Sequence, residues 1–192
     1  MCNQWRETKV NELTTAEWKD VLRQLADIGI RKVGFNGGEP LLRKDLAEIF
    51  AEVTALGMSP ALITSGYLLD EARLEALLKA GMAHITVSID GVGAEYEKIR
   101  GREWGRVEKA AELVGKAYRD GRVDANIGFV IMKQTLDHLQ GVQALCERVG
   151  LPLTFSLVDT TPFFFQIPQE KRSAQDSNWI APEDEPKVRA IQ

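Results

Sequence analysis

Hydrophobic positions along the chain switch repeatedly between a helical and a strand period, which predicts repeated strand–helix units. A first helix is expected after Thr14 and Glu17, a capping pair, and should end before Gly29. The same order of helix, glycine and strand then recurs along the chain. The predicted strands span residues 32–36, 61–64, 84–89, 125–132 and 153–158. The pattern therefore predicts an α/β domain with five strands.

The order of elements leaves two architectures open, a curved barrel-like sheet and an open doubly wound sheet, because right-handed connections allow both. The predicted strand 84–89 is rich in β-branched residues, as expected of a strand that is buried on both faces. After Asp159 the period is lost, and prolines and three consecutive phenylalanines accompany polar runs. We therefore expect one domain over residues 1–159 and an irregular extension over 160–192 that begins a further region.

Composition narrows the classes of partner and compartment. The 192 residues are 44% hydrophobic, which is enough for one sizeable core, and the formal net charge is −4. Charges of both signs are mixed and no basic block is present, so nucleic acid is not an expected partner. No apolar run approaches the about 20 residues that span a bilayer, and the N-terminus does not resemble a signal peptide. We expect a cytoplasmic protein without a membrane partner.

A glycine-rich loop follows the first predicted strand, with the sequence Asn-Gly-Gly-Glu-Pro at 36–40. Gly37 and Gly38 would let the backbone approach a ligand closely, and Pro40 would stiffen the exit from the loop. The carboxylate of Glu39 suits an amine or hydroxyl ligand and would repel phosphate. A tight turn with a surface glutamate is the alternative interpretation of these residues.

Two further strands end in small polar groups, at Thr64 and at Ser88 and Asp90. Because the carboxyl ends of parallel strands share one edge, we expect these groups and Glu39 to converge at one rim. Hydroxyl and carboxylate groups there can bind ribose hydroxyls or an amine, and Arg100 can pair with a carboxylate. The alternatives are a helix cap or turn for the serine and aspartate, and a solvated surface position for the arginine.

These motifs, in their order along the chain, resemble the radical S-adenosylmethionine (SAM) superfamily, particularly its branch of peptide-modifying and cofactor-building enzymes. They are a cysteine, Gly-Gly-Glu-Pro, a strand end similar to Thr-Asn-Gly, and Ser-Ile-Asp-Gly. The resemblance covers residues 1–159 and implies an α/β fold that is a partial (β/α)6 TIM-like barrel lacking its first strand. In that family a Cys-x-x-x-Cys-x-x-Cys loop binds a [4Fe–4S] cluster, and Cys2 matches its third cysteine. The first two cysteines would precede residue 1, so the chain alone is not expected to hold the cluster or cleave SAM.

The resemblance also implies an activity, namely reductive cleavage of SAM at the cluster to a 5′-deoxyadenosyl radical that abstracts hydrogen from a peptide or small-molecule substrate. An external donor such as a flavodoxin or ferredoxin would supply the electron. The loop after the first strand would meet the SAM amino group chiefly through its backbone, and the arginine would face the SAM carboxylate. The strand 127–132 would offer apolar atoms to the adenine. The implied SAM-binding residues are Gly37, Gly38, Glu39, Pro40, Thr64, Ser88, Asp90 and Arg100.

Two departures and two alternatives accompany this interpretation. Ser65 stands where the family often has asparagine, and Cys146 shares a helix face with apolar residues, which predicts a structural role. His84 and His138 have no partners at metal-ligand spacing. The alternative functions are a degenerate barrel that serves as a scaffold without a cluster, and an ordinary barrel lyase or open-sheet nucleotide binder. The last lacks support because the chain has no Gly-x-Gly-x-x-Gly start and no evident lysine or metal triad.

Overall fold

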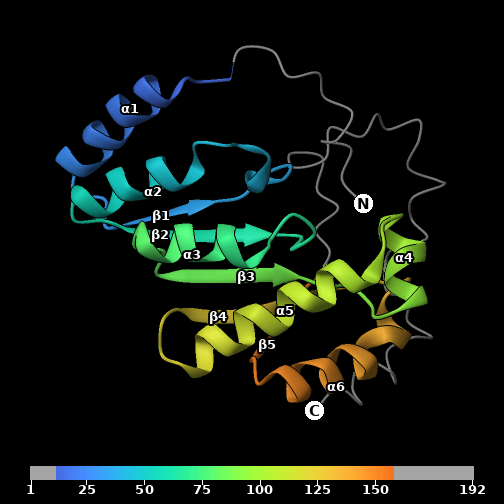
Figure 1. Cartoon of the computed structure of the whole chain (residues 1–192). Helices are drawn as coiled ribbons and strands as arrows, with labels where there is room; N and C mark the ends of the chain where they lie inside the picture. The colour runs from blue at the N-terminus through green and yellow to red at the C-terminus, as the bar shows by residue number, and fades with distance from the viewer. Residues whose placement is uncertain (1–11, 158–192) are drawn as a thin grey trace, which may run out of the picture.

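The computed structural model describes residues 12–157 as an α/β domain (Figure 1). The predictions for Cys2, for the domain boundary at 159 and for the extension over 160–192 concern residues outside this range and stay predictions. The strands are β1 (Lys32–Phe35), β2 (Ser59–Thr64), β3 (His84–Ser88), β4 (Asp124–Ile131) and β5 (Leu153–Leu157). The helices are α1 (Thr15–Asp27), α2 (Leu46–Ala55), α3 (Glu71–Lys79), α4 (Ala94–Arg100), α5 (Trp104–Arg119) and α6 (Leu139–Val149), with 3-10 turns η2 (Pro40–Leu42) and η3 (Leu136–His138).

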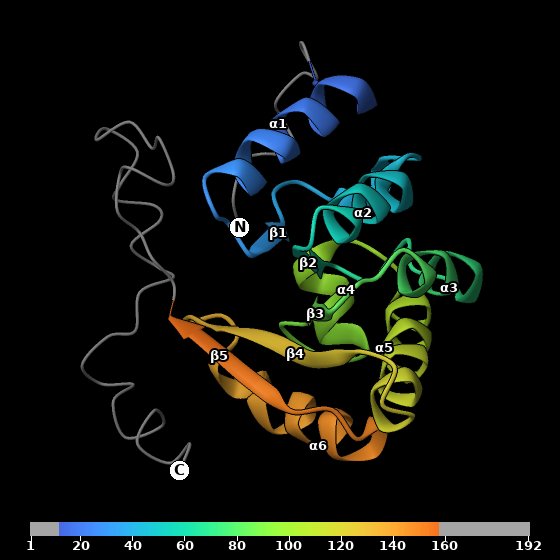
Figure 2. The same ribbon diagram turned by 90° about the vertical axis from the view of Figure 1, so that its left-hand side faces the viewer.

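The five strands are all parallel and lie in the order β1-β2-β3-β4-β5, so each strand pairs with the next one along the chain. Figure 2 shows α2, α3, α5 and α6 on one side of a curved sheet. A doubly wound sheet reverses its strand order and carries helices on both faces, whereas a barrel keeps the sequential order with helices outside. The sequential strand order and the helices on one side identify a partial barrel, and the predicted fold class is confirmed.

The hydrophobic core lies between the sheet and these outer helices. On β3, Ile85 and Val87 are fully buried, whereas His84, Thr86 and Ser88 are only half-buried. The expectation that this strand is buried on both faces is therefore wrong within residues 12–157. The physical reason is that every second residue carries a polar side chain, and those side chains point to the inner, concave face of the sheet.

The start of α1 and the end of α3 follow local sequence signals. The Thr14 hydroxyl accepts a hydrogen bond from the backbone N–H of Glu17 at 3.3 Å, and the glutamate carboxylate accepts one from the backbone of Thr14 at 2.8 Å. Gly81 follows α3 with φ of +91°, and an added Cβ there would lie 2.3 Å from the hydroxyl of Thr54.

No helix in the range 12–157 has both the length and the apolar character to cross a membrane.

Candidate functional site

The polar strand ends gather at one rim of the sheet. Residues 36–39 follow β1, Thr64 ends β2 and is followed by Ser65, and Ser88 ends β3 and is followed by residues 89–90. Because the three strands are parallel neighbours, their carboxyl ends point the same way, toward α4 in Figure 1. The structure therefore brings together the groups that the sequence assigns to one rim.

Glu39 links the loop after β1 to the end of β2 through hydrogen bonds. One carboxylate oxygen accepts hydrogen bonds from the hydroxyl of Thr64 at 2.7 Å and from the backbone N–H of Leu41 at 3.2 Å. The other accepts from the backbone N–H and the hydroxyl of Ser65, at 2.9 and 2.5 Å. All four donors are neutral, so the carboxylate is held in place while its charge has no cationic partner in the described part of the chain. Serine at position 65 is thus long enough to reach Glu39.

The glycine loop leaves open space above its backbone. Gly37 has φ of +114°, a conformation that side chains disfavour, and it and Gly38 are both exposed. An added Cβ at either glycine would meet no atom within 4 Å. Pro40 then begins η2, for which Glu39 is the N-cap. A ligand can therefore reach the backbone amides and carbonyls of this loop.

Asp90 makes a second set of contacts, which link the end of β3 to β4 and α4. It is 2% exposed; one carboxylate oxygen accepts from the backbone N–H of Val130 at 3.1 Å, and the other pairs with the guanidinium of Arg100. Neither Asp90 nor Ser88 caps a helix, since Gly93 is the N-cap of α4. The buried Nε of Arg100 has no partner among residues 12–157. An unsatisfied buried donor costs about 1–3 kcal/mol, so this guanidinium has hydrogen-bonding capacity to spare.

The two predicted hydroxyls differ in what they can offer a ligand. Thr64 is buried, and its hydroxyl donates to Glu39 and accepts from the backbone N–H of Gly66 at 3.1 Å. Ser88 lies opposite Gly128 of β4 and is half-buried, and its hydroxyl has no partner within the described residues. Ser88 is therefore the hydroxyl of the pair that is free at the rim.

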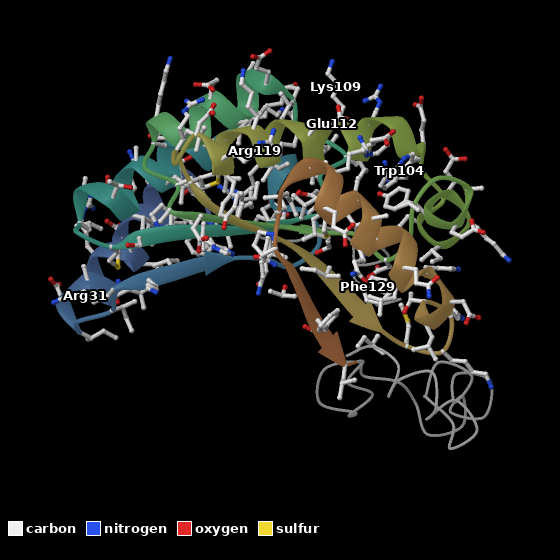
Figure 3. All side chains as sticks on the ribbon, turned by 90° about the horizontal axis from the view of Figure 1, so that it is seen from below. Arg31, Trp104, Lys109, Glu112, Arg119 and Phe129 are labelled. Carbon is white, nitrogen blue, oxygen red and sulfur yellow. The ribbon has the colours of Figure 1, made fainter. Side chains whose placement is uncertain are left out.

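The strand expected to meet the adenine offers less apolar surface than its sequence suggests. Ile127, Phe129 and Ile131 are buried among the outer helices, and Figure 3 labels Phe129 near α6. Gly128 and Val130 alternate with them and face the inner side. Of the strand 127–131, Val130 is therefore the apolar side chain that faces the inner side at the rim.

Sequence reasoning missed a polar network on the inner face of the sheet. The ring of His84 lies 2.8 Å from the amide oxygen of Asn126 and 2.9 Å from the carboxylate of Asp124. The hydroxyl of Thr86 donates to the same amide oxygen at 2.8 Å, and the amide nitrogen donates to the hydroxyl of Thr154 at 2.6 Å. The signal available in the sequence was the polar residue at every second position of β3. The network joins β3, β4 and β5 through side chains.

An open hollow of about 440 Å³ lies beside the rim, lined by Lys98, Ile99, Gln134 and His138. The Nδ1 atom of His138 is 3.4 Å from the backbone carbonyl oxygen of Asp90, so this imidazole lies next to Asp90. Lys98 and Gln134 are both exposed. The hollow therefore borders the candidate site on the side of α4 and η3.

Metal-binding groups do not cluster within residues 12–157, where no set of three His, Cys, Asp or Glu side chains could hold an ion. Cys146 is buried in the core, and burial raises the pKa of its thiol to about 11. A thiol with this pKa stays protonated near neutral pH, which agrees with a packing role. The predicted cluster ligand Cys2 lies outside the described residues.

Comparison with curated proteins supports the family resemblance. The model of the radical SAM superfamily matches residues 1–146. A PqqA peptide cyclase from Gluconobacter oxydans is 37% identical over 145 residues, which is 75% of this chain and 40% of that protein. A PqqA peptide cyclase from Granulibacter bethesdensis is 35% identical over 146 residues, or 74% of this chain and 38% of that protein. The chain thus spans about two fifths of the length of these relatives.

Solved structures share the fold at lower identity. Streptococcus suis SuiB bound to the precursor peptide SuiA matches with a TM-score of 0.69 and 18% identity, over 95% of this chain and 42% of that one. Native anSMEcpe with bound AdoMet and the Cp18Cys peptide matches with a TM-score of 0.65 and 20% identity, over 81% of this chain and 45% of that one. Since the family model covers well over half of the sequence, the chain belongs to the radical SAM superfamily.

Proposed function

We propose that the chain is the SAM-binding core of a radical SAM enzyme that modifies a peptide. The observation that carries this proposal is the arrangement of the rim. The carboxylates of Glu39 and Asp90 hold the strand ends together there, and other polar groups remain free to face a ligand. These groups are the exposed backbone at Gly37 and Gly38, the hydroxyl of Ser88 and the partly exposed guanidinium of Arg100. SAM carries an ammonium, a carboxylate and ribose hydroxyls, and these groups are complementary to the free groups of the rim.

Each group of the rim then has a role toward SAM. The carbonyls of the glycine loop accept from the ammonium, and the uncompensated charge of Glu39 behind them favours that cation. Arg100 donates to the SAM carboxylate while it keeps its bond to Asp90. Ser88 meets a ribose hydroxyl, and Val130 lies against the adenine. A [4Fe–4S] cluster would be held by Cys2 and two further cysteines, and it would supply the electron for reductive cleavage of SAM and so for hydrogen abstraction from the substrate.

Support for a peptide over a small-molecule substrate comes from the relatives. The two similar curated proteins are named for cyclisation of a peptide, and the two similar structures contain a peptide. A flavodoxin or ferredoxin is the proposed electron donor, since SAM cleavage at the cluster requires one electron. The cytoplasm is the proposed compartment, because it keeps cysteine thiols reduced.

Cluster reconstitution tests the proposal in a protein whose Cys-x-x-x-Cys-x-x-Cys motif ends at Cys2. Anaerobic addition of iron and sulfide should give the broad absorbance of a [4Fe–4S] cluster, and reduction with SAM should release 5′-deoxyadenosine. Cys2→Ser should abolish both, with Cys146→Ser as the matched control that leaves both intact. SAM binding without cluster assembly would instead favour the scaffold function, and no SAM binding would overturn both readings.

A further inference from the structure

A pair of arginines stacks on one tyrosine beside the rim. The guanidinium carbon of Arg102 lies 4.8 Å from the centre of the Tyr67 ring, and that of Arg106 lies 5.2 Å from it. Tyr67 belongs to the loop after β2, whereas the arginines come from the connection between α4 and α5 and from the first turn of α5. Two distant parts of the chain therefore place two cations on a single ring.

Stacking of this kind leaves the hydrogen-bonding edges of the guanidinium groups free. Arg102 is exposed and has no hydrogen bond or ion pair with any of residues 12–157. Arg106 has one ionic contact, to Glu103 at 4.0 Å, and both of those side chains are more than half exposed. An exposed contact at that distance contributes little, so neither arginine is committed to a carboxylate among residues 12–157.

The segment that carries the arginines is itself anchored. Trp104, between them, packs on the buried ring of Tyr96 with the ring centres 5.3 Å apart, and its backbone N–H donates to Glu97 at 3.0 Å. Figure 3 shows Trp104 at the start of α5, next to α4. Because the arginines flank this anchored residue and stack on Tyr67, they lose less conformational freedom when they bind a ligand.

The arginine pair also lies at the mouth of the candidate SAM site. Tyr67 is two residues after Ser65, which Glu39 binds, and Arg102 is two residues after Arg100, which pairs with Asp90. In Figure 1, α4 and the start of α5 lie beyond the carboxyl ends of β2 and β3. A group held by the two arginines would therefore sit next to the ligand-facing backbone and hydroxyl of the rim.

We propose that Arg102 and Arg106, stacked on Tyr67, form a receptor for one carboxylate of the peptide substrate, either an acidic side chain or the C-terminus; this inference rests on the proposed function. A guanidinium edge suits a planar carboxylate, which accepts charge-assisted hydrogen bonds, and either arginine can offer one. A broad acidic protein surface is a poorer match, because Glu97 and Glu103 lie beside the pair and the chain has a net charge of −4. The receptor therefore selects a single acidic group.

The test compares two capped peptides on the full chain by nuclear magnetic resonance, acetyl-Gly-Glu-Gly-amide and acetyl-Gly-Gln-Gly-amide. The glutamyl peptide should shift the side-chain N–H signals of Arg102 and Arg106 and bind about tenfold more tightly than the glutaminyl peptide. Arg102→Gln with Arg106→Gln should remove that preference, and Arg31→Gln should not, since Arg31 lies at the opposite end of the sheet (Figure 3). Tyr67→Phe should keep the preference and Tyr67→Leu should weaken it, because stacking needs only the ring.

The outcomes separate this inference from the proposed function. Equal affinity for the two peptides, or equally tight binding of inorganic phosphate, would overturn the carboxylate receptor. An unchanged preference in the double arginine variant would do the same. SAM is titrated calorimetrically into the reconstituted protein whose motif ends at Cys2, and it should bind equally with and without the two arginine substitutions. If that reconstituted protein does not bind SAM, the proposed function is contradicted, whereas intact SAM binding without a peptide preference would contradict the receptor alone.

Discussion

The two carboxylates at the rim, Glu39 and Asp90, hold strand ends together in different ways. Glu39 is half-buried and accepts only from neutral hydroxyl and backbone donors. Asp90 is almost fully buried and is paired with the guanidinium of Arg100. The charge of Glu39 is therefore available to a cationic ligand group, whereas the charge of Asp90 is already neutralised. We infer that the carboxylate of Glu39 serves ligand binding and that the carboxylate of Asp90 serves stability.

The largest expected effect is on stability, at Asp90. Asp90→Ala should lower the free energy of unfolding by about 3 kcal/mol or more, because it leaves Arg100 without its partner and the backbone N–H of Val130 unsatisfied. Urea denaturation followed by circular dichroism measures this. Asp90→Asn is the matched control and should cost less, since it keeps an acceptor for Val130. A decrease of less than about 1 kcal/mol in the free energy of unfolding of the alanine variant would contradict a structural role for the Asp90 carboxylate.

Next in size is the effect of Arg100 on SAM binding. Arg100→Gln should weaken SAM binding roughly ten- to a hundredfold, because a hydrogen bond to a charged group contributes about 1.5–3 kcal/mol. Calorimetric titration measures the affinity for SAM at a temperature below the unfolding transition. Arg122→Gln removes an exposed pair with Glu75 and is the control that should bind SAM as the wild type does. If both variants bind SAM equally, Arg100 has no role toward the ligand.

Glu39→Gln tests the other half of the comparison. Removing the charge while keeping the size should weaken SAM binding about tenfold, and it should lower the free energy of unfolding by only about 1 kcal/mol, for one lost hydrogen bond. Calorimetric titration and urea denaturation measure the two effects, and Asp90→Asn, measured in both ways, should show the opposite balance. A larger stability loss in Glu39→Gln than in Asp90→Asn would reverse the assignment of roles.

The smallest expected effect is at Ser65. Ser65→Ala removes the hydroxyl bond to Glu39 but keeps the backbone N–H bond, so the free energy of unfolding should fall by about 1 kcal/mol. SAM affinity should change less than threefold, because the charge of Glu39 remains. Ser65→Asn, which introduces the residue common in the family, should keep both properties near wild type. A tenfold loss of SAM affinity in Ser65→Ala would mean that the hydroxyl itself contacts the ligand.

The sequence by itself determined the α/β class, the order of the elements and the rim. Helix caps such as Thr14 with Glu17 and the apolar period are local signals, and they located the strands to within about two residues. Parallel strands share one edge for their carboxyl ends, so the motif residues after β1, β2 and β3 had to lie near one another. These conclusions need no knowledge of which side chains touch.

Only the tertiary structure decided the partners of those residues. Glu39 and Thr64 are 25 residues apart in the chain, and Asp90 and Val130 are 40 apart. Their contacts depend on the register between strands, as the inner-face network of His84 and Asn126 also does. The apolar period reports which face of an element is buried, and it carries no information on which residue of a neighbouring strand lies opposite. The pairing of charges at the rim therefore came from the fold alone.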